Sequence, residues 1–346
     1  QQLDGVNAMS GIMPSGVKNM SEGTVLIVED NDVLRDGLDE MLSIEGYSTV
    51  TAADGREALS KMETVTPDLI LADIAMPVMD GFQLFTAVRD RSAWVTIPFI
   101  FLTARAETVD IIAGKNLGAE DYLVKPIGRE ELVTNLRSRI ARTSQLKTTQ
   151  LKEAHLASLT ALAKAIELRD TYTGGHVERV MEYALAVGTH LGWNESSLEH
   201  LRYGAILHDI GKIHIRESAL LKTSSLNDDE LEEIRRHPVI GAEMIADIPY
   251  LAGAVPIVRY HHERWDGKGY PEGLSGKDIP EGARIVAVVD TFDAMTTDRP
   301  YSSAVSLQEA NEELKRWAGE QYDPGVISAF QRALAEGEIQ TISEAY

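Results

Sequence analysis

Residues 24–30, Thr-Val-Leu-Ile-Val-Glu-Asp, decide how the first ordered part of the chain folds. The apolar run Val25 to Val28 predicts a strand that is buried on both faces, and two acids follow it directly. From Val33 to Ile44 the apolar side chains recur every three or four residues, which predicts an amphipathic helix. The ordered part of the chain is therefore expected to begin with a strand followed by a helix.

The same alternation continues along the chain. A further helix is expected at residues 55–62, and more helical stretches lie between the later strands. Four more short apolar runs predict strands at residues 47–50, 69–72, 99–102 and 121–124. Five strands that alternate with helices predict a doubly wound α/β fold with a five-stranded parallel sheet. Such sheets bind their ligands beyond the carboxyl ends of the strands.

Polar residues stand at those ends. Glu29 and Asp30 follow the first strand, Asp73 the third, Thr103 the fourth and Lys125 the fifth. Three acids at one edge of a sheet repel each other unless a hard cation such as Mg²⁺ lies among them. A carboxylate beside that ion could accept a phosphoryl group, which the threonine and the lysine would then contact. A single acid at a strand end is usually only solvated, but five suitable residue types at the strand ends indicate a phosphorylation site.

The motifs around these residues resemble those of response-regulator receiver domains. They are residues 28–31, 73–81 (Asp-Ile-Ala-Met-Pro-Val-Met-Asp-Gly), 102–104 and 122–126. The resemblance implies that Asp73 is the phosphoacceptor and that Glu29 and Asp30 help to hold magnesium. It also implies that Thr103 and Tyr122 form the switch pair, and that a histidine kinase is the partner.

Composition excludes several classes of protein. The formal charge of −21 disfavours a protein that holds a nucleic-acid polymer, because phosphate binding needs clustered cations. The absence of cysteine excludes disulfides, thiolate zinc sites and cysteine nucleophiles. No apolar run reaches the roughly 18 residues that a membrane span needs. We therefore expect a cytoplasmic protein.

Four segments are expected along the chain: a disordered leader at 1–22, the receiver domain at 23–141, a connecting helix at 142–168 and a second domain at 155–346. The connecting helix is expected because residues 130–170 contain neither proline nor glycine. Its apolar residues do not form a strict heptad. Pairing of this helix with a second subunit, as a homodimer, and a simple surface helix both remain open.

The second domain is predicted to be all-helical, and only residues 285–289 are β-branched enough to suggest a strand.

All nine histidines lie after residue 150. Imidazole and carboxylate together are typical ligands of Fe, Mn, Ni or Zn. Seven residues form a candidate set for two such ions: His176, His208, Asp209, His237, His261, His262 and Asp290. Asp209 could bridge ions about 3.5–4 Å apart, an arrangement suited to phosphodiester hydrolysis. Taken singly, each histidine could be a surface or capping residue, the reading kept for His155, His190, His200 and His214.

Three motifs in this half resemble those of HD-GYP domains. They are 208–212 (His-Asp-Ile-Gly-Lys), 261–271 (His-His-Glu-Arg-Trp-Asp-Gly-Lys-Gly-Tyr-Pro), and 290–296 with 299–301 (Arg-Pro-Tyr). The resemblance implies a metal-dependent phosphodiesterase that converts cyclic di-GMP to linear pGpG or GMP. It implies the seven ligands above, with Asp209 and Lys212 as catalytic residues. It also implies that Lys212, Gly269, Tyr270 and Arg299 bind the substrate.

Two positions depart from the HD-GYP pattern. Tyr172 stands where some members carry a glutamate that binds a third metal, so we expect two metals. Ser302 follows the Arg-Pro-Tyr motif where a basic residue is usual, which could weaken binding of the substrate. The main hypothesis is therefore a response regulator with phosphodiesterase output. The alternatives are a signalling adaptor that binds cyclic di-GMP or proteins with little turnover, and a hydrolase of another nucleotide.

Two local expectations concern the site. Lys212 should share a helical face with His208, one turn away, and stabilise an oxygen of the scissile phosphate. The glycines at 267, 269, 273 and 276 should form a flexible loop that admits a nucleotide. In that loop Trp265 or Tyr270 could stack on guanine or could anchor the fold.

Overall fold

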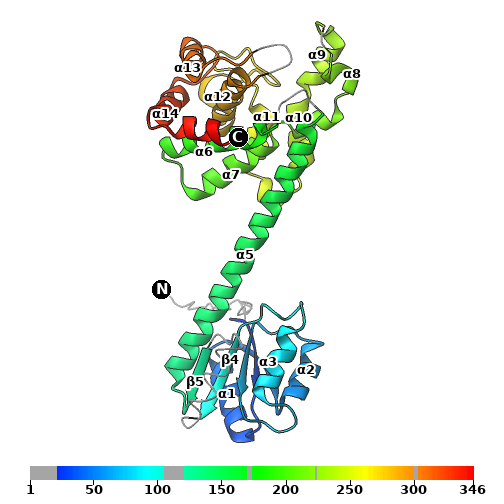
Figure 1. Cartoon of the computed structure of the whole chain (residues 1–346), viewed down its shortest axis with the longest axis vertical. Helices are drawn as coiled ribbons and strands as arrows, with labels where there is room; N and C mark the ends of the chain where they lie inside the picture. The colour runs from blue at the N-terminus through cyan, green and yellow to red at the C-terminus, as the bar shows by residue number, and fades with distance from the viewer. Residues whose placement is uncertain (1–21, 105–120, 170–173, 223, 299–302) are drawn as a thin grey trace, which may run out of the picture. The chain divides into compact units, whose positions relative to one another are not determined.

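The computed structural model describes residues 22–104, 121–169, 174–222, 224–298 and 303–346 (Figure 1). All but the last residue of the expected leader 1–22 thus lies outside the described residues. The chain divides into two compact units, Gln1–Leu151 and Lys152–Tyr346. The boundary falls inside α5 (Arg129–Glu167), so one continuous helix contributes residues to both units.

The first unit contains a five-stranded parallel sheet in the order β2-β1-β3-β4-β5. This confirms the predicted doubly wound fold. The strands are β1 (Thr24–Val28), β2 (Ser48–Ala52), β3 (Leu69–Asp73), β4 (Phe99–Ala104) and β5 (Asp121–Lys125). The strand order reverses between β1 and β3, and in such folds the crevice at this point is where ligands bind.

Helices cover both faces of the sheet. They are α1 (Asp32–Ile44), α2 (Gly55–Met62), α3 (Gly81–Arg89) and the first turns of α5. Alternate strand residues point to opposite faces. Leu26 and Phe101 therefore lie in a core with α2 and α3, whereas Ile27 and Leu102 lie in a core with α1 and α5.

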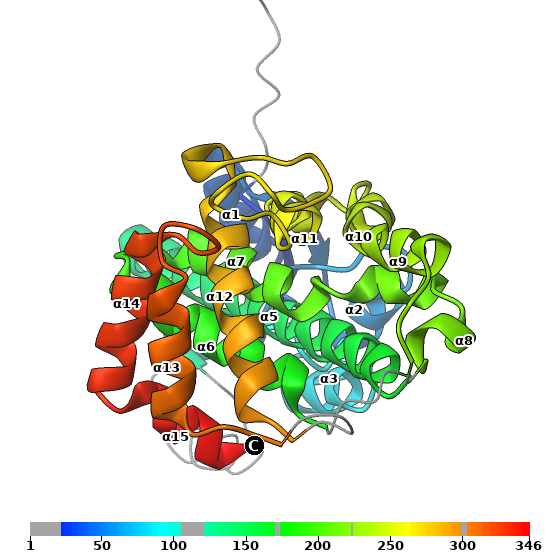
Figure 2. The same cartoon turned by 90° about the horizontal axis from the view of Figure 1, so that it is seen from above.

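The second unit is helical throughout its described residues. Its α-helices are α6 (His176–His190), α7 (Glu195–Leu207), α8 (Glu217–Leu220), α9 (Asp228–Arg235), α10 (His237–Ile245), α11 (Val255–Tyr260), α12 (Glu281–Thr296), α13 (Leu307–Arg316), α14 (Pro324–Ala335) and α15 (Glu338–Ala345). Short 3-10 helices, labelled η1 (Ile210–His214), η2 (Pro249–Leu251) and η3 (Gly276–Asp278), connect some of them. Helix α12 packs against α13 and α14, as Figure 2 shows.

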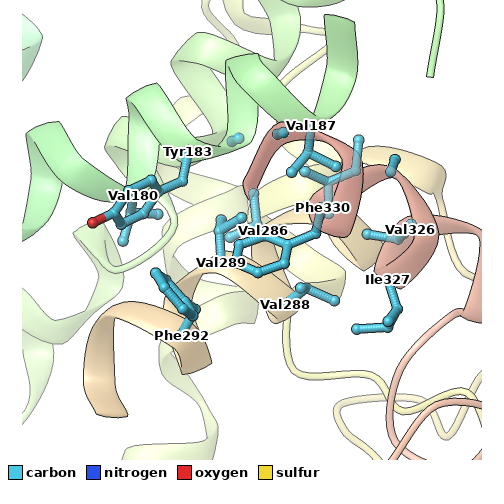
Figure 3. Close-up of a cluster of buried hydrophobic side chains, with 14 of the residues drawn as sticks. Val180, Tyr183, Val187, Val286, Val288, Val289, Phe292, Val326, Ile327 and Phe330 are labelled. Atoms are coloured by element: carbon cyan, nitrogen blue, oxygen red, sulfur yellow. The ribbon is translucent and has the colours of Figure 1, made fainter. Parts of the chain in front are cut away.

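The core of this unit joins α6, α12 and α14. Tyr183, Phe292 and Phe330 are fully buried there, and Figure 3 shows the two phenylalanines among the valines of α12. The ring centroids of Phe292 and Phe330 lie 4.8 Å apart. These contacts fix α12 in the unit, and α12 carries one of the candidate metal ligands, Asp290.

Residues 285–289, which could pass for a strand by propensity, lie within helix α12. Their β-branched side chains suit either element, but this helix is buried on most of its surface, so it needs no polar face. Among the described residues, no helix is both long enough and apolar enough to cross a membrane.

Candidate metal centre

Helix ends carry most of the candidate metal ligands. His176 is the first residue of α6 and His237 is the first residue of α10. The pair His208-Asp209 lies between α7 and η1, and the pair His261-His262 follows α11. Because several helix ends meet here, ligands more than 100 residues apart in sequence lie side by side.

The seven candidate residues fall into two groups. In each group the possible ligand atoms all lie within 4.8 Å of one another. One group is Asp209, His237, His261 and His262; the other is His176, His208 and Asp290. Asp209 also joins the groups, since its Oδ2 is 3.3 Å from Nε2 of His208 and its Oδ1 is 3.2 Å from Nε2 of His237. This is the position that a bridging carboxylate needs.

The hydrogen bonds of His237 and His261 indicate that their ring nitrogens suit a cation. Nδ1 of each ring lies 2.7 or 2.8 Å from a backbone carbonyl oxygen, which can only accept, so Nδ1 carries the proton. In the neutral ring Nε2 then presents a lone pair. When both rings are neutral, the two Nε2 atoms face each other at 3.3 Å, each with a lone pair. A cation between them would relieve this repulsion, so the donor set fits a metal ion.

The pKa values of two candidate ligands, His262 and His208, are shifted in opposite directions, and both shifts are compatible with a bound cation. Burial lowers the pKa of His262 to about 3, helped by repulsion from His237, so its ring is neutral and free to coordinate. Burial also favours neutral His208, but the carboxylates Asp209 and Asp290 outweigh it and raise the pKa of His208 to about 9. A bound cation would take the place of that proton.

A close backbone approach holds Asp209 near His237. A Cβ atom on Gly211 would lie 2.0 Å from the carbonyl oxygen of His237 and 2.7 Å from the nitrogen of Gly241. Only glycine therefore lets η1 lie against α10 at this distance. The glycine of the 208–212 motif thus has a geometric role that its sequence position alone did not reveal.

Lys212 differs from expectation. We expected an α-helix that placed Lys212 one turn from His208, but α7 ends at Leu207 and Lys212 lies in the 3-10 helix η1. Its Nζ lies 2.7 Å from Oδ2 of Asp209 instead. The ammonium group of Lys212 therefore lies in the candidate metal centre, beside the carboxylate of Asp209, which joins the two ligand groups.

The glycine-rich loop is more constrained than the expected flexible loop. Buried Glu263 accepts hydrogen bonds from the backbone nitrogens of Glu272 and Gly273, at 2.7 and 3.0 Å. A Cβ on Gly269 would lie 2.4 Å from the nitrogen of Arg264. The ring of Tyr270 stacks on His262 with centroids 4.8 Å apart, so this tyrosine borders the ligands.

Three residues singled out from the sequence, Tyr172, Arg299 and Ser302, lie outside the described residues. Two residues around the candidate ligands were not predicted from the sequence: Asp293, and Arg179, which contacts Asp293. Both are buried, and Asp293 is hydrogen-bonded to His176. The spacing of three residues between Asp290 and Asp293 on a helix was the available signal, because it places both on one face.

The first unit brings Glu29, Asp30 and Asp73 together at the carboxyl ends of the strands, within 4.8 Å of one another. Nζ of Lys125 lies 2.7 Å from Oε2 of Glu29 and 3.0 Å from Oδ1 of Asp73. Burial raises the pKa of Glu29, and hydrogen bonds to both acids raise the pKa of Lys125 against the effect of its own burial. A Cβ on Gly81 would lie 2.3 Å from the carbonyl oxygen of Asp73, so this motif too needs its glycine.

The expected switch residues, Thr103 and Tyr122, lie on the neighbouring strands β4 and β5. Thr103 is buried at the end of β4. The ring of Tyr122 stacks on Phe101 at 5.4 Å, and its hydroxyl is buried without a hydrogen-bond partner among the described residues. A buried hydroxyl without a hydrogen-bond partner is costly, so a second position of the Tyr122 side chain that gave its hydroxyl a partner would lower the free energy.

Comparison with known proteins assigns each unit to a domain family. Residues 25–137 match the response regulator receiver domain, and residues 160–326 match the HD domain. A cyclic di-GMP phosphodiesterase of Thermotoga maritima is 33% identical over 89% of this chain and 89% of its own length. The cyclic di-GMP phosphodiesterase response regulator RpfG of Xanthomonas campestris is 36% identical over 82% of this chain and 80% of its own. A 3'3'-cGAMP-specific phosphodiesterase of Vibrio cholerae is 34% identical over 51% of this chain and 34% of its own.

The chain is thus a response regulator that joins a receiver domain to a hydrolase domain of the HD class, whose members depend on metal ions. More specifically, it belongs to the family of cyclic di-GMP phosphodiesterase response regulators.

Proposed function

We propose that this chain hydrolyses cyclic di-GMP to linear pGpG, GMP or both at a dinuclear metal centre, and that phosphorylation of Asp73 regulates the reaction. The observation that carries the proposal is the position of Asp209 between two groups of buried imidazole and carboxylate ligands. Phosphodiester hydrolysis is the chemistry that a pair of bridged ions serves well.

The proposed ligands are those of the two groups, and the ions are Fe, Mn, Ni or Zn. When bound, they would supply a water nucleophile at neutral pH and neutralise charge at phosphorus. Lys212 would hold Asp209 in its bridging position and place a positive charge beside the scissile phosphate. Gly269, Tyr270 and Arg299 are proposed substrate contacts. The stacking of Tyr270 on His262 supports that role for the tyrosine.

In the receiver, Asp73 would accept a phosphoryl group from a histidine kinase while Glu29, Asp30 and Asp73 hold Mg²⁺. Lys125 already contacts Asp73, so it could pair with the added phosphoryl oxygens. Thr103 and Tyr122 would form the switch, and this role is supported by the Tyr122 hydroxyl, which is buried and has no hydrogen-bond partner within the part of the chain that the structure describes.

Helix α5 is the proposed route from the receiver to the metal centre. Its first turns pack in the receiver core through Leu132 and Leu136. Its last residue, Glu167, accepts a hydrogen bond of 3.0 Å from the backbone nitrogen of His176, a proposed metal ligand. A shift or rotation of α5 would therefore move His176 through Glu167, and it would change how often the metal centre adopts its active arrangement.

Domain boundaries and assembly also remain proposals. We place the receiver at 23–141, the connecting helix at 142–168 and the HD-GYP domain at 155–346. Leu146 and Leu151 of the connecting helix are more than half exposed, which supports pairing with a second copy of the chain. We also propose that the protein acts in the cytoplasm, which its match to a cyclic di-GMP phosphodiesterase response regulator supports.

The test is a substrate panel. Protein purified without oxygen and loaded with Mn²⁺ or Fe²⁺ should convert cyclic di-GMP to pGpG or GMP, and chromatography would identify the product. The double variant His208→Ala/Asp209→Ala should be inactive. Faster turnover of cyclic GMP–AMP would change the assigned substrate, and tight binding of cyclic di-GMP without product would make the chain an adaptor.

A further inference from the structure

The metal-site histidines differ in what holds their rings. In His208, His237 and His261, Nδ1 lies close to the carbonyl oxygen of the residue three positions earlier. The partners are Ala205 at 2.7 Å, Ile234 at 2.7 Å and Val258 at 2.8 Å. His176 is different, because its Nδ1 lies 2.7 Å from a carboxylate oxygen, Oδ2 of Asp293.

The position of His176 in its helix explains the difference. The other three rings each follow a helical turn that supplies a carbonyl group. His176 is the first residue of α6 and follows Gly175, whose φ of 95° is left-handed, so no turn of α6 precedes it. Its partner must come from another element, and α12 supplies it.

Asp293 is well suited to act as an anion toward His176. It is completely buried and lies three residues after Asp290, so both carboxylates project from the same face of α12. Arg179 donates from Nε to Oδ1 at 2.6 Å and from Nη2 to Oδ2 at 3.1 Å. These two contacts pair the buried carboxylate with a charged guanidinium group.

Arg179 also fixes the orientation of this carboxylate. Its two contacts on Asp293 form a planar fork, which leaves the carboxylate little freedom to rotate. Nη1 of Arg179 donates to the carbonyl oxygen of Gly174 and Nη2 donates to the hydroxyl of Thr297, both at 3.2 Å. The arginine thus holds the chain before α6 and the end of α12 together around His176.

We infer that Asp293, held by Arg179, is a positioning residue that orients His176 and thereby sets the metal affinity of the group His176, His208 and Asp290. A carboxylate that accepts the Nδ1 proton fixes the tautomer and makes Nε2 more basic than a carbonyl partner does. The other group, with Asp209, His237, His261 and His262, does not use this carboxylate. The inference rests on the proposed dinuclear site. It adds that the metal affinity of one position depends on Asp293, whereas that of the other position does not.

The test compares metal binding in two aspartate variants. Asp293→Asn removes the charge but keeps the shape of the side chain. We expect it to weaken binding at one of the two positions by about 10–100-fold and to leave one ion per chain at limiting metal, measured by elemental analysis and titration. The matched control is Asp323→Asn, which breaks another buried aspartate–arginine pair: Asp323 accepts hydrogen bonds from Arg284 and from the backbone nitrogen of Gly325, not from a proposed ligand. The control should keep both ions even if it melts at a lower temperature.

Arg179→Gln supplies an independent variant. It should weaken the same position by a smaller factor, since the carboxylate remains but can rotate. Retention of two ions with unchanged affinity in Asp293→Asn would overturn the inference. So would equal loss of both ions that parallels a fall in melting temperature in both aspartate variants. Wild-type protein with two ions and no turnover would instead refute only the proposed activity.

Discussion

Substitution of Gly211 by alanine should disrupt the metal centre without touching any proposed ligand. The added Cβ would lie 2.0 Å from the carbonyl oxygen of His237, whereas an ordinary carbon–oxygen contact is about 3.3 Å. The next atom that the Cβ would meet is the backbone nitrogen of Gly241 at 2.7 Å, which also belongs to α10, so no side chain can move away to make room. Helices η1 and α10 must therefore separate by more than about 1 Å.

That separation is large for a metal site. Asp209 precedes η1 and His237 begins α10, so the two proposed ligands would move apart with their helices. Metal–ligand distances tolerate only about 0.2 Å. A misplacement of about 1 Å typically costs about 100-fold in rate. Overpacking of this kind also destabilises the fold by about 1–3 kcal/mol.

Metal content, melting temperature and turnover of cyclic di-GMP would be measured on Gly211→Ala beside the wild type. The matched control is Gly37→Ala in α1 of the receiver, since a Cβ at that position meets nothing within 4 Å. The control should keep the wild-type metal content and turnover and should melt at no lower temperature. Two tightly bound ions and full activity in Gly211→Ala would show that the close approach of η1 and α10 does not position these ligands.

Three further predictions concern both units. Asp73→Asn should abolish labelling of the receiver by acetyl phosphate and Mg²⁺, whereas Asp80→Asn, at the N-cap of α3, should still be labelled; labelling of Asp73→Asn would place the phosphoacceptor elsewhere. Phe330→Ala should lower the free energy of unfolding of the second unit by about 3–5 kcal/mol in denaturant titrations, because the ring is fully buried. Leu162→Ala, 58% exposed, should change it by less than about 0.5 kcal/mol, and equal effects would contradict the assigned core. Removal of metal by a chelator should lower the melting temperature of the second unit, since an ion at 100 times its dissociation constant contributes about 2.7 kcal/mol; an unchanged temperature would argue against bound metal.

Local pattern was sufficient for most of the fold. The apolar runs predicted the strands to within a few residues, because a strand buried on both faces must be apolar throughout. The edge with Glu29, Asp30 and Asp73 was also predictable, since parallel strands end at the same edge of a sheet. Residues 285–289 could not be assigned in this way, because a buried helix and a buried strand share one composition.

For the metal centre, residue types along the chain indicated which side chains could bind ions, and the motifs indicated the family. The tertiary structure decided how those residues divide into two groups, since the division depends on where helices distant in sequence meet. It also decided the partners of Lys212 and His176, because a 3-10 turn redirects the lysine and a helix start leaves the histidine without a carbonyl from its own helix. Such contacts depend on the direction of side chains in space, which spacing along a chain does not specify.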